Sequence, residues 1–317
     1  MNKLLFIAWI LAVTLISGQV KTNEPSKDNI PTIDQIKTEP INVNTGYSLK
    51  LHSVFLNEDR TIMISVPEGY ESNSKKYPAL YLVDGQWYFN HSVQLLNMLS
   101  SKNNAVLPQM IVVGIPTLEN RQRDLTPTHT EDSKSSGGAD KLYNFIKEEL
   151  IPFIDKNYRT YQYRVLGGAS LGGLFVIYSF MNDPQLFTSY LALSPSMWWD
   201  NRKLLNKTEE FLKNNAGLHN NLFLAVTNEG PSMGVNALAK ILKEKSPKEL
   251  IWKFDEYPDE IHNTVGFKGI YNGLKFVLTN WHYPLIDFGM KGDLSLQSST
   301  IKESYSPKSV NFSEDIL

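Results

Sequence analysis

Along the chain, two patterns of apolar residues alternate. Short runs that are apolar throughout, such as residues 78–83, predict strands buried on both faces of a sheet. Between these runs, apolar residues recur at helical spacing, as in residues 142–153. Strands are expected at residues 48–56, 61–67, 78–83, 109–115, 161–166, 189–193, 221–227 and 250–257. Helices are expected at residues 91–100, 142–153, 171–181, 203–214, 237–245 and 265–281.

This alternation predicts the fold class. Strands separated by helices of this length imply right-handed crossovers and a mostly parallel sheet with helices on both faces. The first two strands instead follow one another directly, with a turn at residues 57–59. We therefore expect one α/β domain over residues 46–284, with no internal repeat.

Both ends of the chain fall outside this pattern. Lys3 precedes an apolar run over residues 4–16 and then the small pair Ser17 and Gly18, which is typical of a cleavable signal peptide at residues 1–18. An uncleaved N-terminal anchor is the alternative. Residues 19–45 are expected to form an irregular leader and residues 285–317 a surface tail. Export would make the protein secreted or periplasmic, without a stable membrane anchor after cleavage.

Composition narrows the chemistry. The 317 residues include no cysteine, which excludes disulfides, thiol nucleophiles, cysteine-ligated metals and cysteine-linked lipid anchors. There are 31 Lys and Arg against 33 Asp and Glu, a formal net charge of −2. A nucleic-acid partner is therefore not expected. Any catalysis must use hydroxyl, imidazole, carboxylate or amine groups.

A candidate nucleophile lies between an expected strand and an expected helix. Gly168-Ala169-Ser170-Leu171-Gly172 matches the G-x-S-x-G nucleophile elbow, in which a sharp turn raises the serine hydroxyl above the sheet edge. The match alone is weak, because a serine capping a glycine-rich helix start looks the same. Its position between strand and helix is what favours a nucleophile at Ser170.

A serine nucleophile needs an imidazole base, which in α/β-hydrolases follows it in the sequence. Of the six histidines, only His219, His262 and His282 follow Ser170. His219 precedes an expected strand, at the wrong end of the sheet, and His282 ends an expected helix. His262 lies in the loop after the last expected strand, where the base is required, although a solvent-exposed loop histidine is the alternative.

The acid that orients the base should follow the preceding strand. Glu229 comes directly after the strand at residues 221–227 and is the first choice. Asp255, Asp259 and Glu260 compete with it, but they lie close enough to His262 in sequence to shape its loop instead.

Two N–H donors must stabilise the tetrahedral oxyanion. The backbone of Leu171, immediately after the nucleophile, is expected to supply one. The other should come from the tight turn expected at residues 84–87, where Gly85 leaves the next amide exposed. Gln86 is the candidate there, with Trp87 as the alternative.

Five motifs in order resemble the Putative esterase group of α/β-hydrolases, which is esterase D-like and includes enterochelin esterases. They are Leu80-Tyr81-Leu82-Val83-Asp84-Gly85, Arg123-Asp124-Leu125-Thr126-Pro127, the elbow, Ser194-Pro195-Ser196-Met197-Trp198-Trp199 and Tyr257-Pro258-Asp259-Glu260-Ile261-His262. The resemblance covers residues 47–283. It implies the α/β-hydrolase fold, the same nucleophile, base and acid, and the same oxyanion donors. Within the resemblance, the segment around the acid Glu229 matches the family pattern least well.

Specificity is expected to come from side chains around the site. The aromatic residues around the site suit a catecholate, a feruloyl ring or a sugar face, or belong in part to the core; they are Trp87, Tyr88, Phe89, Trp198 and Trp199. Arg121 and Arg123 lie in a long polar segment over residues 117–138. Arg123 either binds an anionic substrate or forms an internal salt bridge with Asp124.

The sequence thus predicts a serine esterase that needs neither a metal nor another cofactor. Its substrate is expected to be a siderophore or an ester-substituted carbohydrate, that is, a small-molecule or glycan ester. An acyltransferase of the same fold and a non-catalytic binding protein on a hydrolase scaffold remain the alternatives. The sequence leaves the oligomeric state open.

Overall fold

The structure, a computed structural model, describes residues 37, 39, 45–101, 104 and 106–279. All but the first two belong to a compact unit that begins at Thr45. The expected signal peptide, the tail and nearly all of the leader lie outside the described residues, as does residue 282. Within the described part of the chain, no helix has the length and apolar character needed to span a bilayer.

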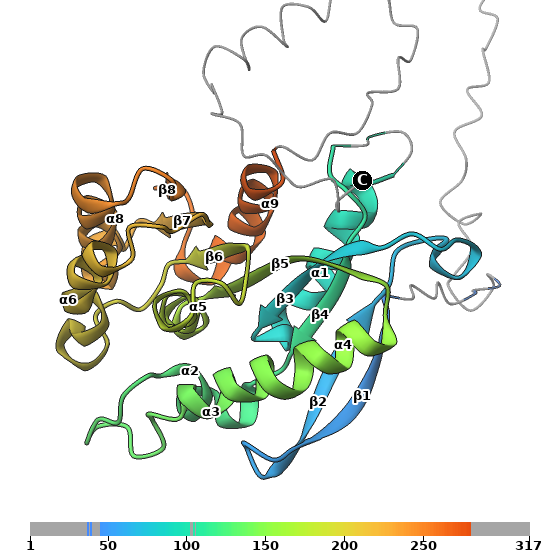
Figure 1. Cartoon of the computed structure of the whole chain (residues 1–317), viewed down its shortest axis with the longest axis horizontal. Coiled ribbons are helices and arrows are strands. Elements are labelled where there is room, and N and C mark those ends of the chain that lie inside the picture. The colour runs from blue at the N-terminus through green and yellow to red at the C-terminus, as the bar shows by residue number, and fades with distance from the viewer. Residues whose placement is uncertain (1–36, 38, 40–44, 102–103, 105, 280–317) are drawn as a thin grey trace, which may run out of the picture. The chain divides into compact units, whose positions relative to one another are not determined.

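An eight-stranded sheet forms the centre of the described residues (Figure 1). Its strands are β1 (Tyr47–Ser53), β2 (Glu58–Ser65), β3 (Tyr77–Val83), β4 (Ile111–Ile115), β5 (Thr160–Ala169), β6 (Ser189–Leu193), β7 (Asn221–Thr227) and β8 (Ile251–Tyr257). Their spatial order is β1-β2-β4-β3-β5-β6-β7-β8. β2 is antiparallel to both β1 and β4, and all later neighbours are parallel. The predicted α/β fold with a mostly parallel sheet is confirmed.

The helices are α1 (Gly85–Leu99), α2 (Arg121–Leu125), α3 (Ala139–Asn144), α4 (Ile151–Asn157), α5 (Leu171–Asn182), α6 (Trp199–Asn214), α7 (Gly230–Met233), α8 (Val235–Lys245) and α9 (Val265–Val277). Helices α1 to α8 lie between strands in the chain order, and α9 follows β8. A π-helical segment, Phe145–Leu150, joins α3 to α4. Short 3-10 turns occur at Tyr70–Ser72, Leu118–Asn120 and His262–Thr264.

The two faces of the sheet carry separate apolar cores, and β3 shows why. All seven of its residues are buried. Tyr81 and Val83 pack into the core that includes α3 to α6 and α8, whereas Leu80 and Leu82 pack into the core formed with α1 and α9. Because successive strand side chains point to opposite faces, a strand covered on both sides must be apolar throughout.

Several boundaries differ from the sequence prediction, and three of these differences have identifiable reasons. The first hairpin turns at residues 54–57, because Ser53 pairs with Glu58. The turn expected at residues 84–87 is instead the start of α1, which begins at Gly85. In α6, the residues Asp200, Asn201 and Arg202 have φ of 46°, 52° and 63°, so a left-handed turn precedes the helix expected from residue 203.

The strand order places the site. From β3 the chain passes to β4 on one side and then crosses to β5 on the other. Ligands of open α/β sheets bind outside the carboxyl ends of the strands at such a reversal. Both Gln86 and Ser170 follow strands that end there.

Candidate active site

Ser170 occupies a sharp turn between β5 and α5. Its φ of 59° and ψ of −121° are rare for a residue with a side chain, and such strain persists only where the surroundings impose it. The Ser170 N–H donates to the Leu193 carbonyl at 2.9 Å. Its own carbonyl accepts from the Leu174 and Ser196 N–H groups at 2.9 and 3.1 Å. These bonds on both sides fix the strained turn.

Glycine is required for this turn to close. A Cβ on Gly168 would lie 2.7 Å from the backbone carbonyl group of Gly172, closer than real contacts allow. The strand end and the first turn of α5 therefore touch through two glycines, as the elbow motif predicts.

The loops after β7 and β8 bring Glu229 and His262 together. His262 Nδ1 lies 2.6 Å from Glu229 Oε1, and the two side chains are 35% and 22% exposed. A carboxylate on Nδ1 favours the tautomer that leaves Nε2 able to accept a proton. Among the described residues, no hydrogen bond joins Ser170 to His262. Such bonds are often long in an enzyme without substrate.

The other carboxylates near His262 have partners of their own. Asp255 contacts Lys253 at 3.0 Å, Asp259 contacts Lys268 at 3.3 Å, and Glu260 accepts from the Thr264 hydroxyl at 2.6 Å. The contact of Asp259 with Lys268 ties the loop that carries His262 to α9, and the bond of Glu260 lies within that loop, whereas Asp255 pairs within β8. For Asp259 and Glu260, these contacts match the loop-shaping alternative.

The proposed oxyanion donors lie at the starts of two helices. Leu171 is the first residue of α5, and Gln86 is the second residue of α1. The first N–H groups of a helix have no partner within it. The Trp87 N–H, however, donates to the Asp84 carbonyl at 3.0 Å. That bond favours Gln86 over Trp87 as the second donor.

The five aromatic candidates divide into exposed and packed residues, and Phe89 is buried in the core formed with α1 and α9. Trp87 is 49% and Trp198 45% exposed. Trp199 is only 6% exposed, and its Nε1 donates to the Thr128 carbonyl at 3.2 Å. Tyr88 lies against Gly266 at the start of α9, and burial raises the pKa of its hydroxyl to about 12. Trp87 and Trp198 are therefore the residues able to form an aromatic wall.

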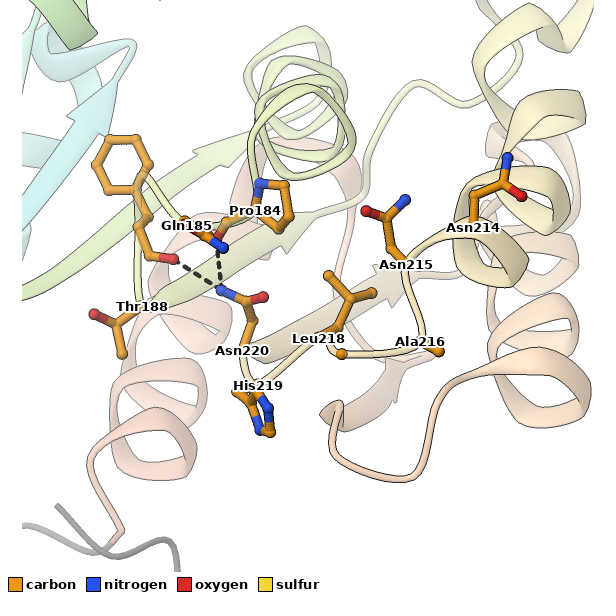
Figure 2. Close-up of a pocket in the computed structure, with 11 residues that line it drawn as sticks. Pro184, Gln185, Thr188, Asn214, Asn215, Ala216, Leu218, His219 and Asn220 are labelled. Carbon is orange, nitrogen blue, oxygen red and sulfur yellow. Dashed lines mark hydrogen bonds between the residues drawn. The ribbon is translucent and has the colours of Figure 1, made fainter.

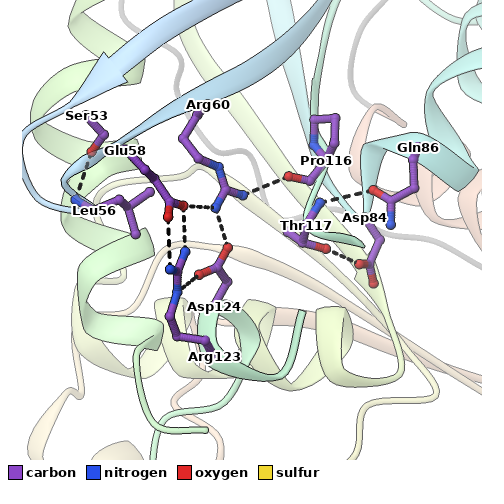
Figure 3. Close-up of polar contacts among 10 residues, drawn as sticks. All are labelled: Ser53, Leu56, Glu58, Arg60, Asp84, Gln86, Pro116, Thr117, Arg123 and Asp124. Atoms are coloured by element: carbon purple, nitrogen blue, oxygen red, sulfur yellow. Dashed lines mark hydrogen bonds and ion pairs between the residues drawn. The ribbon is translucent and has the colours of Figure 1, made fainter. Parts of the chain in front are cut away.

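Arg123 forms an internal ion pair rather than facing the site. Its guanidinium contacts Glu58 at 2.6 Å and Asp124 at 2.7 Å, while Arg60 bridges the same two carboxylates (Figure 3). Asp124 is fully buried. These contacts match the internal salt bridge and not a substrate contact.

Sequence reasoning missed the environment of Asp84. This carboxylate is fully buried, and both Arg121 and the Thr117 hydroxyl donate to it. A signal was present, because an aspartate that directly follows an apolar buried strand requires a partner. The nearby polar segment contained the arginine, but the sequence did not indicate which of its two arginines reaches Asp84.

A pocket of about 480 Å³ lies elsewhere, at the amino ends of β6 and β7 (Figure 2). His219 lines it, so this histidine is at the end of the sheet opposite to Ser170, as expected. Asn220 holds the pocket wall by donating to the carbonyls of Pro184 and Phe187. Across residues 45–101, 104 and 106–279, no three histidine or acidic side chains gather as a metal site requires.

Comparisons with known proteins identify related esterases and a related serine hydrolase. The family model described as Putative esterase matches residues 53–251. Ferri-bacillibactin esterase BesA of Bacillus subtilis is 30% identical over 251 residues, which are 70% of this chain and 86% of that protein. A siderophore enterobactin esterase of Emericella nidulans is 29% identical over 46% of this chain and 54% of its own length. The solved structure of an IroE-like serine hydrolase from Shewanella oneidensis has a TM-score of 0.72 at 32% identity, covering 81% of this chain and 87% of that one.

Proposed function

The chain belongs to the Putative esterase family of carboxylic ester hydrolases, and on that premise we propose that it acts through an acyl-enzyme on Ser170. The observation that carries the proposal is the pairing of His262 with Glu229 at 2.6 Å, on the sheet edge where the strained Ser170 turn also lies. Nucleophile, acid and base follow one another along the chain in the order of α/β-hydrolases.

The reaction begins as Ser170 Oγ attacks the ester carbonyl carbon and His262 Nε2 takes the hydroxyl proton. Glu229 holds the imidazole and stabilises the imidazolium that forms. The N–H groups of Leu171 and Gln86 donate to the oxyanion. Collapse of the intermediate breaks the ester bond, and His262 returns the proton to the leaving alcohol. Water then attacks the acyl-enzyme by the same route and releases the acid.

The proposed substrates are siderophore esters. Two similar proteins are named as esterases of bacillibactin and enterobactin, and both exposed tryptophans suit an aromatic substrate. Trp87 lies in the first turn of α1, which follows β3, and Trp198 directly precedes α6, which follows β6. The two therefore come from segments on either side of β5 in the sheet order. A feruloyl or acetyl ester of a carbohydrate is the competing substrate, and it suits the same aromatic surface.

We also propose that the enzyme is exported. The support is the sequence alone, with Lys3 before an apolar run and small residues at positions 17 and 18. N-terminal sequencing of the mature protein should begin near residue 19. A mature chain that still begins at Met1 would refute cleavage.

The experiment for substrate class compares a ferric tris-catecholate siderophore, methyl ferulate and an acetylated xylan, each with the wild type and with Ser170→Ala. The proposal predicts the highest kcat/KM on the siderophore and loss of turnover in the variant. A higher kcat/KM on methyl ferulate or on the acetylated xylan than on the siderophore would overturn the siderophore assignment. Addition of an alcohol acceptor separates hydrolysis from acyl transfer, because a transferase would form a new ester.

A further inference from the structure

Asp84 is a helix N-cap residue that does not cap its own helix. It precedes α1 in a left-handed conformation, with φ of 56° and ψ of 38°, and its side chain makes no hydrogen bond to the N–H groups of that helix. An aspartate at the N-cap position ordinarily accepts a hydrogen bond from one of those N–H groups. Here the carboxylate is turned away, which leaves the start of α1 open to a ligand.

Arg121 and Thr117 take the place of those N–H groups. Arg121 Nε lies 3.0 Å from both carboxylate oxygens of Asp84, and Nη2 lies 2.9 Å from Oδ2. The Thr117 hydroxyl donates to Oδ1, and the Thr117 N–H donates to the Gln86 side-chain carbonyl at 3.1 Å (Figure 3). A bidentate arginine neutralises the buried charge, which would otherwise repel an oxyanion forming nearby.

The same arginine also reaches the nucleophile turn. Its Nη2 lies 3.5 Å from the carbonyl oxygen of Ala169, two residues before Leu171. Gly172, one residue after Leu171, lies so close to Asp84 that a Cβ there would be 3.1 Å from Oδ2. The pair of Arg121 and Asp84 therefore lies between the two helix starts whose N–H groups must point at one oxygen.

The helix that carries Arg121 is fixed from its other side. In α2, Arg123 and Asp124 form the buried ion-pair network with β2. Arg60 of that network also donates to the Pro116 carbonyl at 2.7 Å, directly before Thr117 (Figure 3). Arg121 is thus held on a short, anchored helix, as a residue that sets a geometry requires.

We propose that Arg121 is a positioning residue that, through Asp84, aligns the N–H groups of Gln86 and Leu171 on the oxyanion. The proposal rests on the proposed function, since it concerns the same oxyanion. Arg121 acts here without touching the substrate. The rival role is a direct contact with an anionic substrate, because its side chain is 23% exposed and its guanidinium lies 5.2 Å from the centre of the Trp87 ring.

Two esters of one leaving group separate the two roles. For Arg121→Ala, kcat and KM are measured on neutral p-nitrophenyl acetate and on anionic mono-p-nitrophenyl succinate. Positioning predicts that kcat falls about 10- to 100-fold on both esters with KM within about threefold, because misplaced oxyanion donors cost about that much. Added guanidinium ion should restore part of kcat in Arg121→Ala and none in the wild type. Arg121→Lys keeps the charge without the bidentate contact, so its kcat should lie between those of the wild type and Arg121→Ala.

Arg164→Ala is the matched control, because it removes an ion pair with Asp155 six residues before the nucleophile on β5. Its kcat should be unchanged. A raised KM confined to the succinate would overturn positioning in favour of substrate contact, as would an unchanged kcat for Arg121→Ala on both esters. If that variant does not fold, Arg121→Lys decides by the same comparison. Absence of Ser170-dependent turnover in the wild type would instead refute the proposed function, and this proposal with it.

Discussion

Glu229 Oε1 contacts His262 Nδ1 at 2.6 Å although 33 residues separate them in the sequence. They meet because β7 and β8 are parallel neighbours, so the loops after both strands lie at one edge of the sheet. The seven paired positions from Asn221 with Ile251 to Thr227 with Tyr257 set this register. Glu229 is thus positioned by strand pairing, independently of the loop that contains His262.

Replacing Glu229 with glutamine should leave the loop in place and remove the charge that stabilises the imidazolium. We expect kcat to fall about 10²- to 10⁴-fold on p-nitrophenyl acetate. Asp259→Asn is the control, because Asp259 contacts Lys268 instead. Its kcat should stay within about threefold. A larger loss in Asp259→Asn than in Glu229→Gln would move the acid role to Asp259.

The adjacent tryptophans should respond to substitution in opposite ways. Trp198 is 45% exposed, so Trp198→Ala should raise KM for an aromatic ester about 2- to 10-fold, as loss of a stacking contact of about 0.5–1.5 kcal/mol predicts. The stability of this variant should not change. Trp199 is buried and bonded to Thr128, so Trp199→Ala should cost about 3–5 kcal/mol of unfolding free energy. Equal effects of the two variants on KM and on thermal unfolding would contradict this division.

Gly168→Ala tests how tightly the nucleophile turn is packed. The new Cβ would lie 2.6 Å from Val83 Cγ2 and 2.7 Å from the Gly172 backbone. We expect a loss of about 1–3 kcal/mol in unfolding free energy, since the backbone must shift to make room, seen as a lower Tm. Gly217→Ala is the control, because no atom lies within 4 Å of its added Cβ. Similar Tm values for both variants would show that the turn accommodates a side chain.

The Glu58 ion pairs predict an acid-sensitive part of the stability. Hydrogen bonds from Arg123 and Arg60 lower the pKa of Glu58 from 4.5 to about 2, against the opposing effect of burial. Because the folded-state pKa is the lower one, the unfolded chain binds more protons between these values, and stability falls as the pH drops from about 4.5 to about 2. Glu58→Gln should show a smaller fall over that window in denaturant titrations. An identical pH dependence would rule out this contribution.

The sequence predicted what depends on local pattern. Strands such as β6 and β7 have the expected bounds, because an apolar run between turn signals is unambiguous when both faces are buried. The choice of Glu229 as the partner of His262 was based on its place directly after β7. The start of α1 was missed, because its left-handed N-cap residue is an aspartate held by Arg121 from 37 positions away. The same applies to Arg123, whose partner Glu58 lies on β2. Neither long-range ion pair leaves a periodic signal.

Mapping the residue modified by diethyl p-nitrophenyl phosphate tests the central claim most directly. This reagent phosphorylates an activated serine in the manner of an ester substrate. Mass spectrometry of the digested protein should find one diethylphosphoryl group per chain, on Ser170, with turnover lost in proportion to labelling. The His262→Ala variant should label far more slowly. Stoichiometric labelling of another residue, or full turnover after Ser170 is labelled, would contradict the assignment of Ser170 as the nucleophile.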